Sequence, residues 1–240
     1  MDRFIVATSG AYHPSAYGGI EFGPLVRHAM ELAGVHGRRP QFGFLATATG
    51  DRLSRLAERG EAARRQGWQF NPLQLFAMPN VADIREYLLA QDVIWVDGGS
   101  VANLLAVWQV HGIGEIMREA WERGVILGGV SAGSMCWHQG GATDSFGEEL
   151  RPCTNGLGFL PYGNGVHYGV NPLRRTLLQE LVGQGVFPSA YSSEDGIGLV
   201  YHGTELMEVI SDRPEVFGWH TYCDGDDVVE ERLQPRRLRV

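Results

Sequence analysis

Residues 124–135, GVILGGVSAGSM, carry the strongest indication of the fold. The apolar run VILGGV has the length and composition of a buried strand, and SAGSM can begin a helix. Between them, Ser131 occupies the centre of a Gly-x-Ser-x-Gly pattern. Glycines at 129 and 133 let the backbone pass closely on both sides. The stretch therefore predicts a sharp turn from a strand into a helix.

Ser131 has two interpretations at such a turn. The turn would expose its hydroxyl above the sheet edge, where the free N–H groups of the helix N-terminus also point, as a nucleophile requires. Alternatively, the serine only caps the helix. We favour the nucleophile because both a strand and a helix flank the motif.

Apolar runs and helical patterns alternate along the rest of the chain, which predicts a mainly parallel sheet with helices on both faces. The sequence thus indicates one α/β domain over residues 1–240, with three layers (αβα) and a C-terminal β-hairpin. Residues 143–171 are rich in Gly and Pro and weakly periodic, which is typical of a functional segment. The expected strands are 3–9, 41–48, 72–76, 92–99 and 124–130, the helices 24–34, 53–67, 81–90, 101–109, 114–123 and 172–185, and the hairpin 196–211.

Composition narrows the class of protein. The 240 residues are 44% hydrophobic and carry a net charge of −8, which gives no reason to expect a nucleic acid or a membrane as partner. No run approaches the roughly 20 apolar residues of a membrane span. The N-terminus lacks the core of a signal peptide, and three cysteines do not make a disulfide framework, so we expect a cytoplasmic protein.

A nucleophilic serine needs a base and a group that orients it. His167 is the preferred base because the irregular segment that carries it must pack near the sheet's carboxyl edge. His220 stays an alternative, whereas His138 would lie roughly 10 Å along the helix from the serine. Asp144 is the preferred orienting acid. Its competitors are Glu148, Glu149, Glu194 and Asp195.

Metal and cofactor motifs are missing from the sequence. There is no His-Glu-x-x-His, no Cys-x-x-Cys and no Gly-x-Gly-x-x-Gly after the first strand. A phosphate-binding Gly-Lys-Ser/Thr loop is excluded because all 20 basic residues are arginine. We therefore expect neither a metal nor a cofactor.

Four motifs in order resemble the peptidase E family of serine peptidases, which includes aspartyl dipeptidases and has cyanophycinases as relatives. They are VDGGSVANLL (96–105), ILGGVSAGSMCW (126–137), ATDS (142–145) and GLGFLPYGNGVHY (156–168). The resemblance implies a short-peptide substrate, possibly Asp-Xaa, and a triad of Ser131, His167 and Asp144. It also implies oxyanion-hole N–H groups from Gly99 and Ala132.

The same resemblance implies that a basic side chain and an acidic side chain of the protein lie beside the bound substrate. Arg174 and Arg175 are the candidates for the cation, and Asp195, with Glu194 beside it, corresponds to a family acid that contacts the substrate amine or tunes the histidine. A homodimer is expected, with Trp108, Trp121 and Trp137 either on its surface or in the core. Three other functions stay open: a related exopeptidase with a different preference for the terminal residue, an esterase or thioesterase that uses His220 as its base, and a binding protein without activity.

Overall fold

Five parallel strands form the centre of the main sheet, as the apolar runs predict. The computed structural model describes residues 2–239. In it the strands lie in the order β1 (Phe4–Thr8), β7 (Ile126–Val130), β6 (Val93–Val96), β4 (Gln41–Leu45) and β5 (Gln69–Leu73). Every residue of β6 and β7 is buried, as expected where helices cover both faces of a strand.

The predicted hairpin extends this sheet on the other side of β1. It consists of β12 (Ile197–His202), which is antiparallel to β1, and β13 (Glu205–Ser211). The short β16 (Arg236–Arg237) forms the edge beyond β13 and completes eight strands. The hairpin expected over 196–211 is therefore confirmed.

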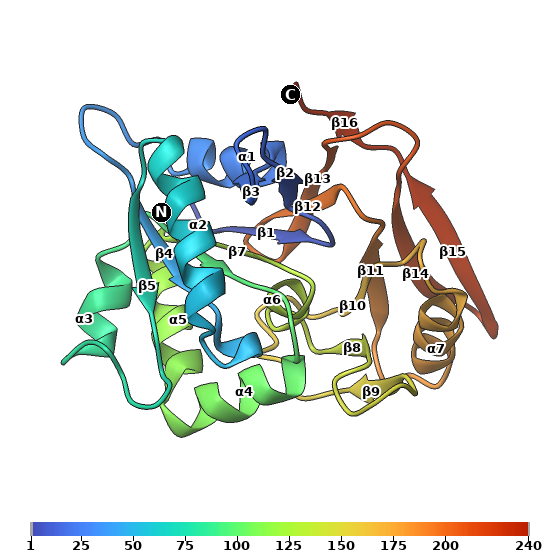
Figure 1. Ribbon diagram of the computed structural model, residues 1–240. Helices are drawn as coiled ribbons and strands as arrows, with labels where there is room; N and C mark the ends of the chain where they lie inside the picture. The colour runs from blue at the N-terminus through green and yellow to red at the C-terminus, as the bar shows by residue number, and fades with distance from the viewer. Residues whose placement is uncertain (1, 240) are drawn as a thin grey trace.

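Helices cover both faces of the sheet, so the three-layer arrangement is also confirmed (Figure 1). One apolar cluster joins the sheet to α1 (Pro24–Leu32) and α2 (Leu53–Arg65), and the other joins it to α3 (Ile84–Leu89), α4 (Val101–Val110) and α5 (Ile113–Glu122). Trp108, Trp121 and Trp137 are buried in the second cluster. They belong to the core and offer no aromatic surface to a second copy.

A second sheet was not predicted. It has the strand order β10 (Gly163–Val166), β11 (Ser189–Ser193), β14 (Gly218–Asp224) and β15 (Asp227–Leu233), and α7 (Pro172–Gly183) packs on it. Figure 1 shows this sheet beside the carboxyl end of β1. The irregular segment 143–171 thus contributes a strand. Two short ribbons complete the structure, β2 (Tyr12–Pro14) with β3 (Ile20–Phe22) and β8 (Gly141–Thr143) with β9 (Arg151–Cys153).

Two element boundaries differ from the expected ones for local reasons. Asp83 accepts a hydrogen bond from the Glu86 N–H, so α3 starts later than expected, at residue 84. β5 begins at Gln69 and contains Pro72, which is tolerated because β5 is an edge strand. The short η1 (Thr47–Thr49) and α6 (Ala132–Met135) follow β4 and β7 directly.

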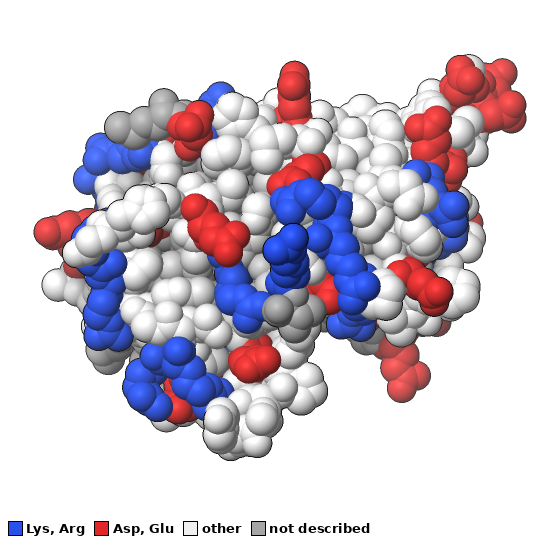
Figure 2. Space-filling view, turned by 90° about the horizontal axis from the view of Figure 1, so that it is seen from above, with Lys and Arg blue, Asp and Glu red and all other residues white. Residues whose placement is uncertain are grey.

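Basic side chains gather in the middle of the face that Figure 2 displays. Arg27 of α1 and the C-terminal residues Arg236, Arg237 and Arg239 line a shallow recess there. The Arg236 guanidinium donates two hydrogen bonds to Glu208, so part of this charge is neutralised within the protein. Within residues 2–239, no helix combines the length and apolar character needed to cross a membrane.

The buried His138, just after α6, should make the free energy of unfolding depend on pH. Its ring is fully buried, and its two nitrogens contact the Ser134 carbonyl at 3.0 Å and the Tyr201 hydroxyl at 3.2 Å. Burial lowers the pKa of His138 from 6.5 to about 4. Because the folded pKa is depressed, the unfolded chain binds this proton first. The folded protein therefore loses up to about 3 kcal/mol of stability as the pH falls from 6.5 towards 4.

Urea unfolding of the wild type and of His138→Gln at pH 7 and pH 4.5 checks this expectation. The wild type should lose more stability between the two pH values than the variant does. Replacing the exposed His202 by Gln serves as the control and should leave the wild-type difference unchanged. Equal losses in the wild type and in His138→Gln would contradict the assignment.

Candidate active site

Ser131 lies at the sharp turn between β7 and α6. Its φ of 57° and ψ of −110° are unusual for a residue with a side chain, and such a conformation costs of order 1–3 kcal/mol. Close packing enforces the turn, since a Cβ on Gly133 would lie 2.1 Å from the Val96 carbonyl oxygen. Ser131 occupies the N-cap position of α6, but its side chain makes no capping hydrogen bond. The hydroxyl is thus not used as a helix cap.

The end of β1 brings Ser131 and His167 together. The Ser131 N–H donates to the Thr8 carbonyl at 2.9 Å, and the His167 N–H donates to the hydroxyl of the next residue, Ser9, at 3.0 Å. His167 also has a positive φ, of 54°. In the described residues no hydrogen bond joins the Ser131 hydroxyl to the imidazole. Catalytic hydrogen bonds of this kind often tighten only when substrate binds.

Asp195 is the carboxylate that contacts the histidine. Its Oδ1 lies 2.6 Å from His167 Nδ1, and both side chains are about one-third exposed. Gly10 packs against the turn that carries Asp195, since a Cβ on Gly10 would lie 3.2 Å from the Gly196 nitrogen. With Nδ1 held by Asp195, Nε2 is the ring nitrogen left to act on a hydroxyl.

Asp144, the orienting acid expected from the sequence, does not contact His167 in the structure. Its carboxylate accepts a hydrogen bond from the Arg174 guanidinium at 2.7 Å and none from His167. Arg174 also donates to the Ala142 carbonyl and is only 8% exposed. The pair fastens the start of α7 to the end of β8. Asp144 therefore neutralises a nearly buried arginine.

The other residues expected to bind substrate are also engaged within the protein. Arg175 pairs with Glu230 and stacks 4.2 Å above the Trp219 ring. The two carboxylate oxygens of Glu194 accept hydrogen bonds from the Phe217 N–H and the Trp219 indole N–H. Each of these side chains, like Arg174, is thus paired with another group of the protein.

His220, the alternative base, lies in β14 and stacks on Tyr191 with 4.4 Å between ring centroids. Burial lowers its pKa. In residues 2–239 no carboxylate forms a hydrogen bond or ion pair with its ring. His220 therefore lacks the acidic partner that a triad histidine requires.

Gly99, in the loop after β6, and Ala132, the first residue of α6, carry the N–H groups that the resemblance implies for an oxyanion hole. A Cβ on Gly98 would lie 3.3 Å from the Ser131 Cβ, so this loop passes directly beside the serine. The Gly98 N–H donates to Asp97, whereas the N–H groups of Gly99 and Ala132 have no acceptor among the described residues. Two free donors thus flank the hydroxyl, as an oxyanion hole requires.

Two residues that position the site were not singled out from the sequence. Asp97 is fully buried and accepts hydrogen bonds from Tyr12, Arg55 and the Gly98 N–H, so it fixes the oxyanion loop. Burial and the Asp97 charge raise the pKa of Tyr12 well above its usual value. Ser9 bonds to His167 and to the Ser193 carbonyl. Their positions directly after strand ends were the available signal.

Between residues 2 and 239, no group of three or more His, Cys, Asp or Glu side chains is arranged to hold a metal ion. The charged groups around Ser131 instead form the pairs described above.

A serine at a strand-to-helix elbow, with a histidine held by a carboxylate on the neighbouring strand end, is an arrangement typical of serine hydrolases. Residues 22–209 match the model of peptidase family S51, and the chain belongs to that family. It is therefore a serine-type peptidase.

Similar proteins agree with this assignment. The chain is 34% identical over 202 residues to the uncharacterized peptidase YgaJ of Bacillus subtilis (strain 168). This alignment covers 83% of this chain and 86% of that protein. It shares its fold with a putative peptidase E protein from Listeria monocytogenes EGD-e (TM-score 0.61, 17% identity, 98% and 100% of the two chains). A peptidase from an acI-B1 Actinobacterium is also similar (TM-score 0.68, 18% identity, 98% and 95%).

Proposed function

We propose that this serine peptidase hydrolyses short peptides through an acyl-enzyme, with Ser131 as nucleophile, His167 as base and Asp195 as the orienting acid. The observation that carries the proposal is the anchoring of Ser131 and His167 on consecutive residues, Thr8 and Ser9, with Asp195 on the far ring nitrogen. Asp195 replaces Asp144 in the triad implied by the resemblance.

In the proposed reaction, His167 Nε2 takes the proton of the Ser131 hydroxyl while Oγ attacks the scissile carbonyl carbon. Asp195 accepts the Nδ1–H hydrogen bond and stabilises the imidazolium. The N–H groups of Gly99 and Ala132 stabilise the oxyanion, each by about 3 kcal/mol. The histidine gives its proton to the leaving nitrogen. It then activates a water that hydrolyses the acyl-enzyme and regenerates the serine.

The dipeptidase mode, with a preference for Asp-Xaa, is the finer form of this proposal and comes from the resemblance alone. It requires a cation for the aspartyl side chain, and the two arginines expected for that role are engaged elsewhere. An esterase that uses His220 is less well supported, because no acid orients that ring.

Peptide hydrolysis by the purified protein tests the proposal. A panel of di- to tetrapeptides, with Asp or other residues at the N-terminus, is incubated with enzyme and read by mass spectrometry. We expect cleavage of short members of the panel, and labelling of Ser131 by a serine-directed fluorophosphonate. Hydrolysis of simple esters with no cleavage of any peptide would favour the esterase and contradict the proposal.

A further inference from the structure

A recess of about 730 Å³ adjoins the oxyanion loop on the side away from the histidine. The carboxyl ends of β1, β7, β6, β4 and β5 follow one another along the sheet edge. They carry in turn Ser9 with His167, then Ser131, then Gly99, and finally the loops around Thr49 and Phe76 that line the recess. Its volume is within the range of about 300–1,000 Å³ that is usual for small-molecule sites.

The walls of the recess combine apolar surface with one cation. Phe76, Ala106 and Val107 supply the apolar part, and Gly99 forms the border with the oxyanion hole. Arg52 lines the same recess and no acidic residue does, and the Arg52 guanidinium forms no ion pair or hydrogen bond within residues 2–239. A guanidinium beside apolar side chains, in a recess that no acidic side chain lines, is complementary to an anionic ligand.

Helix stability does not explain Arg52. It occupies the N-cap position of the thirteen-residue α2, and its side chain makes no capping hydrogen bond. Arginine is not among the residues that cap helices well, and a positive charge at this end opposes the helix dipole. A cation at this position therefore does not stabilise the helix, whereas it would pair with a bound carboxylate.

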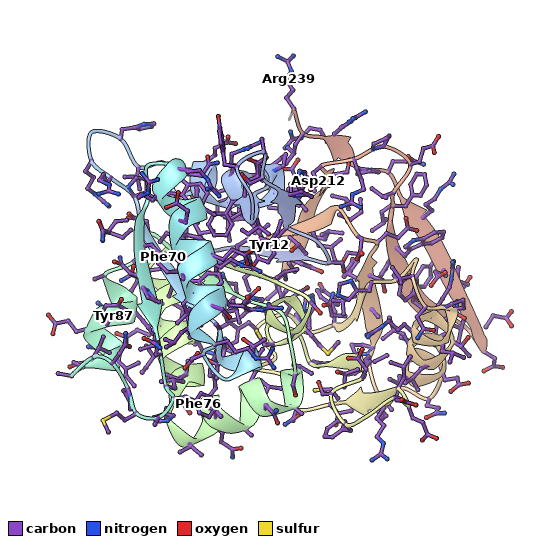
Figure 3. All side chains as sticks on the ribbon, in the orientation of Figure 1. Tyr12, Phe70, Phe76, Tyr87, Asp212 and Arg239 are labelled. Atoms are coloured by element: carbon purple, nitrogen blue, oxygen red, sulfur yellow. The ribbon has the colours of Figure 1, made fainter. Side chains whose placement is uncertain are left out.

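The aromatic wall is held in place by a buried carboxylate. Asp51 has a φ of 52° and is 4% exposed, and its side chain accepts hydrogen bonds from the Leu75 and Phe76 N–H groups. The Phe76 side chain itself is 46% exposed. Figure 3 shows Phe76 on the side of the molecule where α4 lies, and α4 supplies the opposite wall. The backbone of Phe76 is thus held in position, and nearly half of this aromatic residue is exposed.

The direction of the reaction decides which part of a peptide enters the recess. The histidine must reach the leaving nitrogen to protonate it, so the leaving part lies on the His167 side of Ser131. The acyl part then extends past the oxyanion loop, towards Arg52 and Phe76. A recess of this size also exceeds what the side chain of one aspartyl residue can fill.

We infer that this recess binds the acyl part of the peptide, and that Arg52 selects acyl parts which are longer than one residue and carry a carboxylate. The inference rests on the proposed function. Phe76 and Arg52 become specificity-determining residues. Phe76 contacts an apolar side chain, and Arg52 pairs with an acidic group beyond it.

Release of leucine from three peptides tests the inference. Glu-Phe-Leu and Gln-Phe-Leu differ only in the N-terminal side chain, which carries a negative charge for Arg52 to pair with in the first peptide and no charge in the second. In Asp-Leu the acyl part is a single residue. We expect wild-type kcat/KM to be about 10- to 100-fold higher for Glu-Phe-Leu than for Gln-Phe-Leu. Arg52→Gln should bring that ratio close to one, and Phe76→Ala should lower both tripeptide values by a similar factor and so leave their ratio unchanged.

Matched controls separate specificity from folding. Arg237→Gln removes an exposed arginine at the opposite edge of the sheet and should leave the ratio at its wild-type value. Arg52→Gln should melt no lower than the wild type, because it removes a charge that the helix dipole disfavours. The ratio of kcat/KM for Glu-Phe-Leu to that for Gln-Phe-Leu decides the inference. If the wild type releases leucine from both tripeptides with a ratio near one, or if Arg52→Gln keeps the wild-type ratio, that result overturns this inference alone. Faster cleavage of Asp-Leu than of Glu-Phe-Leu would do the same. A wild type that releases no leucine from any of the three peptides would reject the proposed function as well.

Discussion

Replacing Ser131 by Ala is expected to lower kcat by about 10⁵- to 10⁶-fold, the largest effect of any single substitution in this protein. Alanine keeps the Cβ and the backbone turn, so the variant should fold as the wild type does. What it loses is the oxygen that forms the acyl bond. The activity that remains should come only from the oxyanion donors and from substrate binding.

Steady-state kinetics on the best substrate of the panel measures this loss, and circular dichroism verifies the fold. Ser54→Ala, an exposed serine of α2, is the matched control and should retain wild-type turnover. Fluorophosphonate labelling should disappear in Ser131→Ala and persist in Ser54→Ala. Turnover by Ser131→Ala at the wild-type rate would reject this serine as the nucleophile.

The second large effect is expected for Asp195→Asn, which should lower kcat by about 10⁴-fold. An asparagine amide beside Nδ1 can hold the ring in the opposite tautomer, with its proton on Nε2, where a base needs a lone pair. Asp144→Asn is the decisive comparison, because the resemblance assigned the same role to Asp144. Its carboxylate contacts Arg174, so kcat should change by less than about tenfold while the melting temperature falls.

These two variants exchange their predicted outcomes if the assignment is wrong. A large loss in Asp144→Asn together with near-normal turnover in Asp195→Asn would restore the triad that the motifs imply. Measuring kcat and melting temperature on both proteins separates the two cases, because a structural ion pair affects stability and a catalytic partner affects turnover.

The sequence predicted the central sheet and the elbow because both produce local signals. The apolar run VILGGV leads directly into Ser131, and VIWV is followed by Asp97 and two glycines, so the positions of Ser131 and Gly99 could be predicted from neighbouring residues. His167 was chosen from the irregular segment that had to pack near the sheet's carboxyl edge, and the motif resemblance agreed with that choice. The structure brings this residue next to the serine's anchor on β1.

The acid could not be chosen in the same way because its contact depends on an unrecognised strand pair. β10 and β11 are parallel neighbours with Val166 opposite Ser193, so His167 and Asp195 both follow the carboxyl ends of adjacent strands. β10 has the sequence GNGV, whose small residues lack the β-branched pattern of a strand. Because that strand was not predicted, Asp144, which lies on a short loop after the elbow helix, was preferred as the acid that orients the histidine.

The anchoring of His167 on Ser9 joins groups that come from two separate sheets. The nucleophile and the oxyanion loop are built by the parallel strands alone, whereas the base and its acid arrive with β10 and β11. If the smaller sheet is not docked, Ser131 lacks the base and the acid that the proposed mechanism gives it. In the proposed mechanism, peptide cleavage therefore requires that both sheets are folded and docked together.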